Sequence, residues 1–173
     1  SEVSALMNLL LRTIKEEIIE LHKKNVRFTV IGDLDTIPIK TAKGLRDGID
    51  MTKENKGINL NLALNYGSHQ EIIRAVKNLA LKVQEGEIDP ENIDKEKISE
   101  FLYTSNISDP ELLIRTSGEH RLSNFLLWQI AYTEIYMTDL FWPEFREQEL
   151  FDAILEFQSR ERRFGNVKKM IQG

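Results

Sequence analysis

Hydrophobic residues recur along the chain with two different periods, and these periods predict alternating helices and strands. Apolar side chains at helical spacing predict helices over residues 3–22, over residues 68–83 and after Pro143. Residues 58–65 alternate strictly between apolar side chains and mostly asparagine, which is typical of a strand with two different faces. Short apolar runs predict further strands over residues 26–31, 112–115 and 134–137.

Weaker signals lie in the segments between these elements. The polar segment 41–55 has weak helical periodicity, and a short helix is expected around Ile98. A further helix is expected over residues 125–130, directly after a polar loop. Ser68 and Glu71 have the spacing of a capping box, so Ser68 is expected to cap the helix that follows it.

The order of these elements predicts the fold class. Helices alternate with strands, and the connections are long enough for parallel pairing, so we expect an α/β fold with an open, mostly parallel sheet flanked by helices. No repeat, low-complexity tract or linker divides the chain, so residues 1–173 are expected to form a single domain. Ligands of such sheets bind outside the carboxyl ends of the strands, which directs attention to the loops that follow strands.

The first predicted helix has more apolar residues than one core contact needs. The strand at 58–65 presents an equally apolar face, formed by Ile58, Leu60, Leu62 and Leu64. One interpretation is a well-buried helix packed on a sheet. The other is a helix that, together with this strand, also lines an apolar cavity.

The composition of the chain excludes several classes of protein and of functional site. The chain has 173 residues, of which 41% are hydrophobic and 29% charged, and its net charge of −5 argues against nucleic-acid binding. Cysteine is absent, which excludes disulfides, cysteine-bound zinc and thiol catalysis, and the three histidines are too scattered to suggest a metal site. The uncharged stretch 122–133 is shorter than the roughly 20 residues that span a bilayer, so the expected location is the cytoplasm.

The loop after the strand at 112–115 contains the side chains that indicate a functional site most clearly. Arg115 stands at the strand end, and Arg121 and Ser123 follow just before an expected helix. Guanidinium groups, hydroxyl groups and the free amides of a helix N-terminus all bind phosphate. The alternative is a surface loop in which Arg115 pairs with Glu119 and Ser123 only caps the helix.

Glu134 is the second candidate for chemistry. It begins a predicted strand between apolar and aromatic neighbours, where a carboxylate is out of place. Beside a pyrophosphate, one carboxylate is a suitable ligand for Mg²⁺, since this ion takes one or two carboxylates together with phosphate oxygens and water. The alternative is an exposed glutamate at the end of a strand.

Residues 114–129 read Ile-Arg-Thr-Ser-Gly-Glu-His-Arg-Leu-Ser-Asn-Phe-Leu-Leu-Trp-Gln. This stretch closely resembles the signature of the cis-prenyltransferase family, in particular of its bacterial undecaprenyl pyrophosphate synthases. The signature is long and specific. The resemblance continues in order over nearly the whole chain, through residues 2–7, 30–33, 60–67, 131–136, 140–143 and 160–165.

The resemblance implies an enzyme, a transferase of isoprenoid biosynthesis. Such enzymes condense isopentenyl pyrophosphate with an allylic pyrophosphate, usually farnesyl pyrophosphate, into a long cis-polyprenyl pyrophosphate. This product is the precursor of the lipid carrier for cell-wall peptidoglycan. The resemblance further implies Mg²⁺ as cofactor, a hydrophobic tunnel for the growing chain, a homodimer, and association with the membrane when the product is released.

The resemblance also gives roles to individual residues. It makes Glu134 the magnesium ligand. It implies that four residues of the loop bind the pyrophosphate of isopentenyl pyrophosphate, namely Arg115, Arg121, Leu122 and Ser123. Further contributors to substrate binding are Glu119, His120, Arg163 and Gly165, the last two through an Arg-x-Gly motif that reaches the active site of the partner subunit.

Two parts of the family pattern do not occur in this sequence. Residues 65–69 read Asn-Tyr-Gly-Ser-His where the family commonly has Asn-Tyr-Gly-Gly-Arg, so the role of that arginine is not carried over. The motifs His-x-Met-Asp-Gly-Asn-Gly-Arg-Trp and Phe-Ser-x-Glu-Asn-Trp, which hold the catalytic aspartate and asparagine, are not found either.

We therefore expect the sequence to be the C-terminal part of a cis-prenyltransferase catalytic domain. It would lack the N-terminal strands and the catalytic residues of that domain, and it would be inactive alone. The alternative is a non-catalytic subunit that binds isopentenyl pyrophosphate and completes the active site of a partner.

Overall fold

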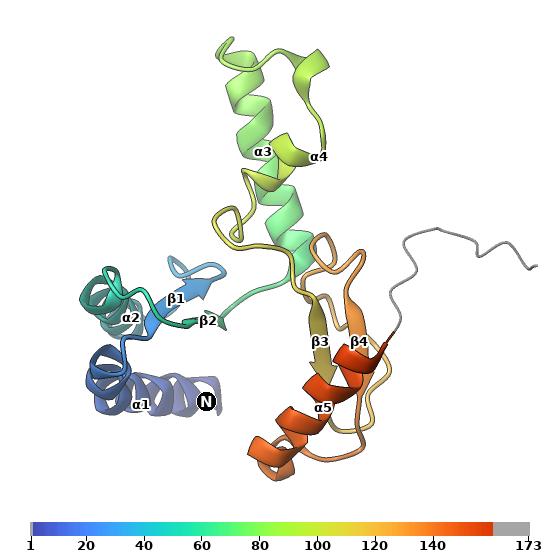
Figure 1. The fold of residues 1–173 in the computed structure, drawn as a ribbon. Coiled ribbons are helices and arrows are strands. Elements are labelled where there is room, and N and C mark those ends of the chain that lie inside the picture. Colours follow the sequence, from blue (N-terminus) through green and yellow to red (C-terminus); the bar gives the residue numbers. More distant parts are fainter. Residues whose placement is uncertain (1, 161–173) are drawn as a thin grey trace, which may run out of the picture. The chain divides into compact units, whose positions relative to one another are not determined.

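The computed structural model describes residues 2–160, with side chains from residue 5 onward. The chain forms two compact units (Figure 1). The first unit comprises the residues up to 108 together with 124–126, and the second comprises residues 109–123 and the residues from 127 onward. The single domain expected over residues 1–173 stays a prediction.

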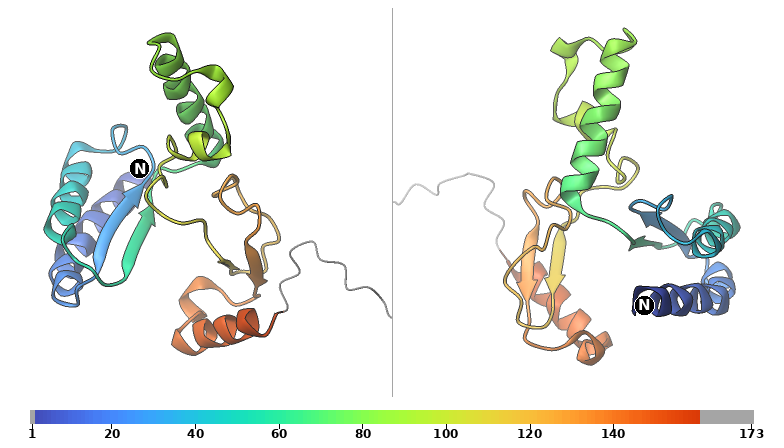
Figure 2. Two further views of the ribbon diagram at one scale, coloured as in Figure 1. Left: turned by 45° about the horizontal axis from the view of Figure 1, so that its top comes forward. Right: turned by 180° about the vertical axis from the view of Figure 1, so that it is seen from behind.

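The first unit begins with two helices packed on a pair of strands. These elements are α1 (Glu2–Lys23), β1 (Arg27–Ile31), α2 (Ile39–Thr52) and β2 (Asn59–Ala63). The strands pair in parallel, with Phe28 opposite Leu60 (Figure 2). Both helices contribute to the buried core on the Phe28 side of this pair, which consists of Ile14, Ile18, Phe28 and Leu45.

Two glycines of α2 allow α1 and α2 to approach each other closely. A Cβ on Gly44 would lie 2.4 Å from Cδ1 of Leu11, and a Cβ on Gly48 would lie 3.2 Å from Cδ1 of Ile18. Glycine lowers helix propensity by about 1 kcal/mol relative to alanine. The weak helical signal of segment 41–55 therefore reflects the space that its partner helix needs.

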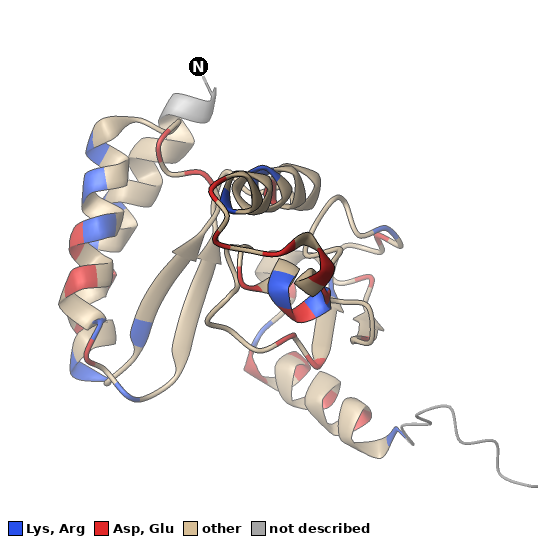
Figure 3. Ribbon diagram, turned by 90° about the horizontal axis from the view of Figure 1, so that it is seen from above, with Lys and Arg blue, Asp and Glu red and all other residues tan. Residues whose placement is uncertain are grey.

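The outer side of α1 is charged, as its amphipathic pattern predicts (Figure 3). Arg12 pairs there with Glu16 at 2.8 Å, and Lys23 pairs with Glu20 at 2.7 Å. Exposed ion pairs contribute only about 0–1 kcal/mol each, so the apolar side of α1 is what holds it on the sheet.

Within residues 2–160, no helix has both the length and the apolar character that a membrane span requires.

The rest of the first unit contains α3 (Ser68–Gln84), η1 (Pro90–Asn92) and α4 (Lys95–Ser99). The expected capping role of Ser68 is wrong, because Gly67 is the N-cap and Ser68 is the first residue of the helix. Glu71, the other residue of the expected box, is fully buried. Its carboxylate accepts hydrogen bonds from the hydroxyl of Tyr66 at 2.5 Å and from the backbone N–H of Tyr103 at 2.8 Å.

The second unit is built on a second pair of parallel strands. Its elements are β3 (Leu112–Arg115), β4 (Glu134–Met137), η2 (Trp142–Glu144) and α5 (Glu147–Ser159). The predicted bounds of both strands are confirmed. Each unit combines helices with parallel strands, so the expected α/β class is confirmed as well.

The helix expected over residues 125–130 is wrong. Ser123, Asn124 and Leu126 have φ angles of 51°, 60° and 47°, and the segment forms a series of turns. A left-handed backbone at three of four successive positions is incompatible with a right-handed helix. The apolar residues that suggested a helix are partly buried within these turns, and Ile130 is in the core.

Candidate functional site

Arg115 is the last residue of β3, and its side chain reaches the end of the loop that follows. Its Nη2 lies 3.5 Å from Oγ of Ser123, and its Nε is buried without a hydrogen-bond partner among the described residues. A buried donor without a partner costs about 1–3 kcal/mol, so this guanidinium is suited to an anionic ligand. Glu119 pairs with Arg121 at 2.8 Å, which contradicts the alternative in which Glu119 neutralises Arg115.

The loop after Arg115 is fastened to the segment that follows β4. The backbone N–H groups of Ser117 and Gly118 donate to the carbonyls of Leu140 and Thr138, at 2.8 and 3.0 Å. The N–H of Thr138 in turn donates to the carbonyl of Arg115 at 2.9 Å. The loop is thus held at the carboxyl ends of both strands, which is the edge where parallel sheets bind ligands.

The remaining loop residues differ in their exposure. Arg121 and Ser123 are exposed, while Leu122 is partly buried. His120 lies at the strand end, with its Nδ1 2.9 Å from Sδ of Met137. Residues 124–131 form turns and not a helix. The loop therefore lacks the helix N-terminus that was expected to add phosphate-binding amides, and the arginine and serine side chains are its main donors.

Glu134 begins β4 and faces a cation. Its Oε2 lies 3.0 Å from Nη1 of Arg160, whose Nη2 lies 2.6 Å from Oε1 of Glu156. The hydrogen bonds to Glu156 and then to Glu134 raise the pKa of the Arg160 guanidinium. The carboxylate of Glu134 is therefore oriented toward a positive charge.

This arrangement fits a magnesium ion that takes one ligand from the protein. Within residues 2–160, no three His, Cys, Asp or Glu side chains converge as a ready metal site. Mg²⁺ binds through one or two carboxylates and completes its shell with phosphate oxygens and water. Glu134 is thus able to hold the ion only with additional ligands from elsewhere.

The structure does not bring all the predicted residues together. In the register of β3 and β4, Glu134 lies opposite Leu112, whereas Arg115 lies opposite Met137. Glu134 is therefore three residues away from Arg115 along the strand direction, a distance of about 10 Å. Side chains alternate between the two faces of a strand, so this odd number of residues places Glu134 and Arg115 on opposite faces of the pair. Arg163 and Gly165 lie outside the described residues.

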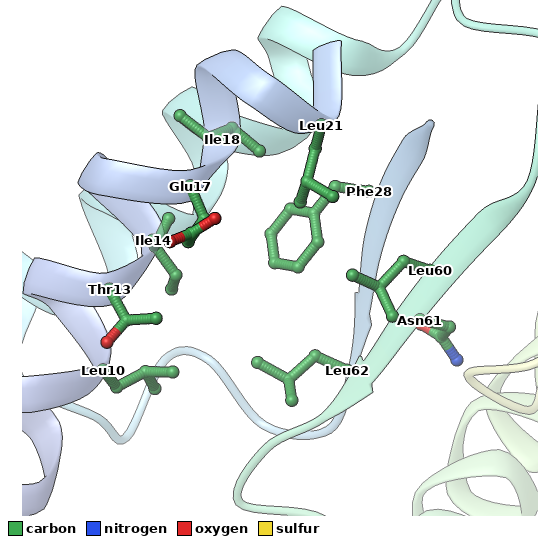
Figure 4. A pocket seen from close by; sticks show the side chains of 10 residues that line it. All are labelled: Leu10, Thr13, Ile14, Glu17, Ile18, Leu21, Phe28, Leu60, Asn61 and Leu62. Carbon is green, nitrogen blue, oxygen red and sulfur yellow. The ribbon is translucent and has the colours of Figure 1, made fainter. Parts of the chain in front are cut away.

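A cavity of about 360 Å³ lies in the first unit, between α1 and the strands β1 and β2 (Figure 4). This cavity favours the interpretation in which the helix lines an apolar space. Its wall includes Leu60 and Leu62 of the predicted strand face but neither Ile58 nor Leu64. The wall is mostly apolar and is formed by Leu10, Thr13, Ile14, Glu17, Ile18, Leu21, Phe28, Leu60, Asn61 and Leu62.

The second unit thus has a parallel strand pair of an α/β protein, with an arginine-containing loop at the carboxyl ends of the strands. The family described as "Putative undecaprenyl diphosphate synthase" matches residues 1–165. The chain belongs to this family, the cis-prenyltransferases.

Curated relatives carry the name isoprenyl transferase. The chain is 44% identical over 171 residues to the isoprenyl transferase of Chlorobaculum tepidum, covering 99% of this chain and 64% of that protein. It is 48% identical over 166 residues to the isoprenyl transferase of Bacillus cereus, covering 96% of this chain and 64% of that protein. The chain therefore spans less than two thirds of the length of these relatives.

Solved structures share the fold. A lavandulyl diphosphate synthase from Lavandula x intermedia, in complex with dimethylallyl diphosphate, matches with a TM-score of 0.91 and 35% identity over 95% of this chain and 72% of that chain. A probable undecaprenyl diphosphate synthase from Campylobacter jejuni matches with a TM-score of 0.82 and 34% identity over 95% of this chain and 75% of that chain. Both likenesses agree with the α/β class and with the family.

Proposed function

We propose that the protein is a cis-prenyltransferase that condenses isopentenyl pyrophosphate with an allylic pyrophosphate such as farnesyl pyrophosphate. The product is a long cis-polyprenyl pyrophosphate, the precursor of the lipid carrier for cell-wall synthesis. Membership of the family supports this proposal. The observation that carries it in this chain is the buried Nε of Arg115, which has no hydrogen-bond partner among residues 2–160.

In this proposal the loop after β3 binds the pyrophosphate of isopentenyl pyrophosphate. Arg115, Arg121 and Ser123 donate hydrogen bonds to it, and each bond to a charged group contributes roughly 1.5–3 kcal/mol. The guanidinium of Arg115 would reach the pyrophosphate beside Ser123, whose Oγ lies 3.5 Å from its Nη2. Glu119 orients Arg121 through their ion pair, and Leu122 and His120 complete the loop around the ligand.

Glu134 is the proposed Mg²⁺ ligand of this chain. The support is the orientation of its carboxylate toward the Arg160 guanidinium, at 3.0 Å. When bound, Mg²⁺ would stabilise the negative charge that develops on the departing pyrophosphate. Glu134 would hold the ion, and the phosphate oxygens would supply further ligands.

The cavity beside α1 is proposed to receive the growing prenyl chain (Figure 4). Its mostly apolar wall supports this role. Burial of each CH₂ group contributes about 0.8 kcal/mol. A chain of several isoprene units would therefore stay in the cavity between successive additions.

A homodimer is part of the proposal, with Arg163 and Gly165 serving the active site of the partner. The second unit supports an interface, because η2 with its N-cap residue and α5 expose five large apolar side chains, Phe141, Trp142, Leu150, Phe151 and Leu155. Light scattering of the complete protein should give twice the mass of one chain. The mass of a single chain at micromolar concentration would contradict the dimer.

Incorporation of labelled isopentenyl pyrophosphate into lipid-extractable product tests the activity. The complete protein, supplied with farnesyl pyrophosphate and Mg²⁺, should form a polyprenyl product. Arg115→Gln should lower the rate by about tenfold or more, whereas Arg27→Gln, at an exposed position of β1, should leave it unchanged. Equal rates for the two variants contradict the proposed site. Binding of isopentenyl pyrophosphate without condensation would instead support the non-catalytic subunit.

A further inference from the structure

Arg160 joins three acceptors at the point where α5 ends and β4 begins. Its Nη1 donates to Oε2 of Glu134 and to the carbonyl of Ile135, both at 3.0 Å. Its Nη2 donates to Oε1 of Glu156 at 2.6 Å. The side chain is 27% exposed. Acceptors from two elements thus fix the guanidinium in one position.

This position matters for any cation that binds Glu134. A divalent ion that approaches the carboxylate meets a fixed positive charge only a few Å away, and like charges repel at this range. Arg160 already bonds to one of the two oxygens that a metal ion would use. Arg160 and the metal ion therefore compete for the same carboxylate.

We propose that Arg160 prevents Glu134 from binding a divalent cation alone and holds its carboxylate ready for a cation that arrives with a pyrophosphate. This inference rests on the proposed role of Glu134 as metal ligand. The negative charge of the pyrophosphate offsets the positive charge of Arg160. Glu156 and the Ile135 carbonyl keep the guanidinium in place when Glu134 turns to the metal. Arg160 is thus a positioning residue.

Binding of Mn²⁺ alone, followed by the paramagnetic resonance signal of the free ion, tests this inference. Arg160→Gln removes the competing charge and should tighten Mn²⁺ binding by about tenfold or more. Arg160→Lys keeps the charge and should bind Mn²⁺ as the unsubstituted protein does. Arg146→Gln, at the exposed N-cap of α5, makes the same change in net charge and should also have no effect.

Three results would overturn the inference. The first is an Arg160→Gln variant that binds Mn²⁺ no more tightly than the unsubstituted protein. The second is an increase in Mn²⁺ affinity that persists in the double variant Glu134→Gln/Arg160→Gln, because the cation then binds somewhere other than Glu134. The third is an Arg160→Lys variant that gains as much as Arg160→Gln, because charge is then not the cause.

Inorganic pyrophosphate tests the second half of the inference. Its addition should raise the Mn²⁺ affinity of the unsubstituted protein more than that of Arg160→Gln, and equal increases would contradict the inference. These measurements do not depend on condensation. If Arg160→Gln binds Mn²⁺ more tightly but the complete protein forms no polyprenyl product, the role of Arg160 is supported and the proposed activity is refuted.

Discussion

Asn124 caps helix α3 from a position 55 residues further along the chain, because its Oδ1 accepts a hydrogen bond from the backbone N–H of His69 at 2.9 Å. Its backbone carbonyl accepts from the N–H of Ser68 at 2.8 Å, and its side-chain amide donates to Oε1 of Gln70 at 3.2 Å. Two of the N–H groups that a helix start leaves unpaired are thereby satisfied. Gly67, the N-cap, makes room for this contact, since a Cβ there would lie 2.8 Å from the Asn124 amide nitrogen.

Two substitutions of Asn124 should distinguish the stability lost with the side-chain cap from the stability lost through strain in the left-handed backbone. Asn124→Gly should lower the free energy of unfolding by about 1 kcal/mol, the usual effect of losing a side-chain cap. Asn124→Ala should lower it by roughly 1–2 kcal/mol more, because a φ of 60° strains alanine but not glycine. Denaturant unfolding measures both effects. An Asn124→Gly variant as stable as the unsubstituted protein would contradict the cap.

Gly32 is expected to be sensitive to any side chain. Its φ is 120°, and a Cβ there would lie 2.0 Å from the carbonyl oxygen of Leu64. Gly86 also has a positive φ, of 72°, but nothing lies within 4 Å of its Cβ position. Gly32→Ala should therefore destabilise the protein by about 1–3 kcal/mol more than Gly86→Ala. Similar unfolding midpoints for the two variants would count against the close approach.

Tyr66 should make the stability fall at alkaline pH. Burial, and then the hydrogen bond to Glu71, raise the pKa of the Tyr66 hydroxyl above its usual value near 10. The folded state keeps a proton that the unfolded state releases, so the free energy of unfolding declines as the pH rises past about 10. Tyr66→Phe should remove this part of the decline.

The same variant should also be less stable at neutral pH. The buried carboxylate of Glu71 loses a donor in Tyr66→Phe, which costs about 1–3 kcal/mol. Urea unfolding between neutral pH and a pH of about 11 measures both effects. Curves of the two proteins that run parallel over this whole range would show that Tyr66 does not titrate as described.

Local patterns predicted most of the helices and strands. The bounds of β3 and β4 follow from short apolar runs, and α1, α3 and α5 follow from a period of 3.6 residues. The same pattern wrongly predicted a helix over residues 125–130. The apolar spacing of this segment resembles that of a helix, but the left-handed backbone of Ser123, Asn124 and Leu126 excludes one.

Contacts between distant residues could not be predicted from spacing. Glu71 has the position of a capping-box residue, yet its carboxylate bonds to Tyr103, 32 residues away. The local pattern singles out Glu134 as a carboxylate among apolar neighbours, but its partner Arg160 follows 26 residues later, and no local spacing predicts this pairing. The sequence suggests which chemical groups form the candidate site, and the folded chain shows how these groups are paired.

Leu62 should influence the length of the product. Its side chain lines the cavity beside α1, so Leu62→Trp should fill part of this space and shorten the prenyl chains that the complete protein makes. Leu81→Trp is the matched control, because Leu81 is exposed on α3 and does not line the cavity. Chromatography of the dephosphorylated products measures chain length. Products of equal length from both variants would refute the role of the cavity.

Isothermal titration calorimetry with isopentenyl pyrophosphate shows directly whether the loop after β3 binds this pyrophosphate through Arg115, whose Nη2 lies 3.5 Å from Oγ of Ser123. Arg115→Gln should weaken binding by about tenfold or more, while Arg27→Gln should bind as tightly as the unsubstituted protein. Equal affinity of Arg115→Gln and the unsubstituted protein would contradict this role of Arg115.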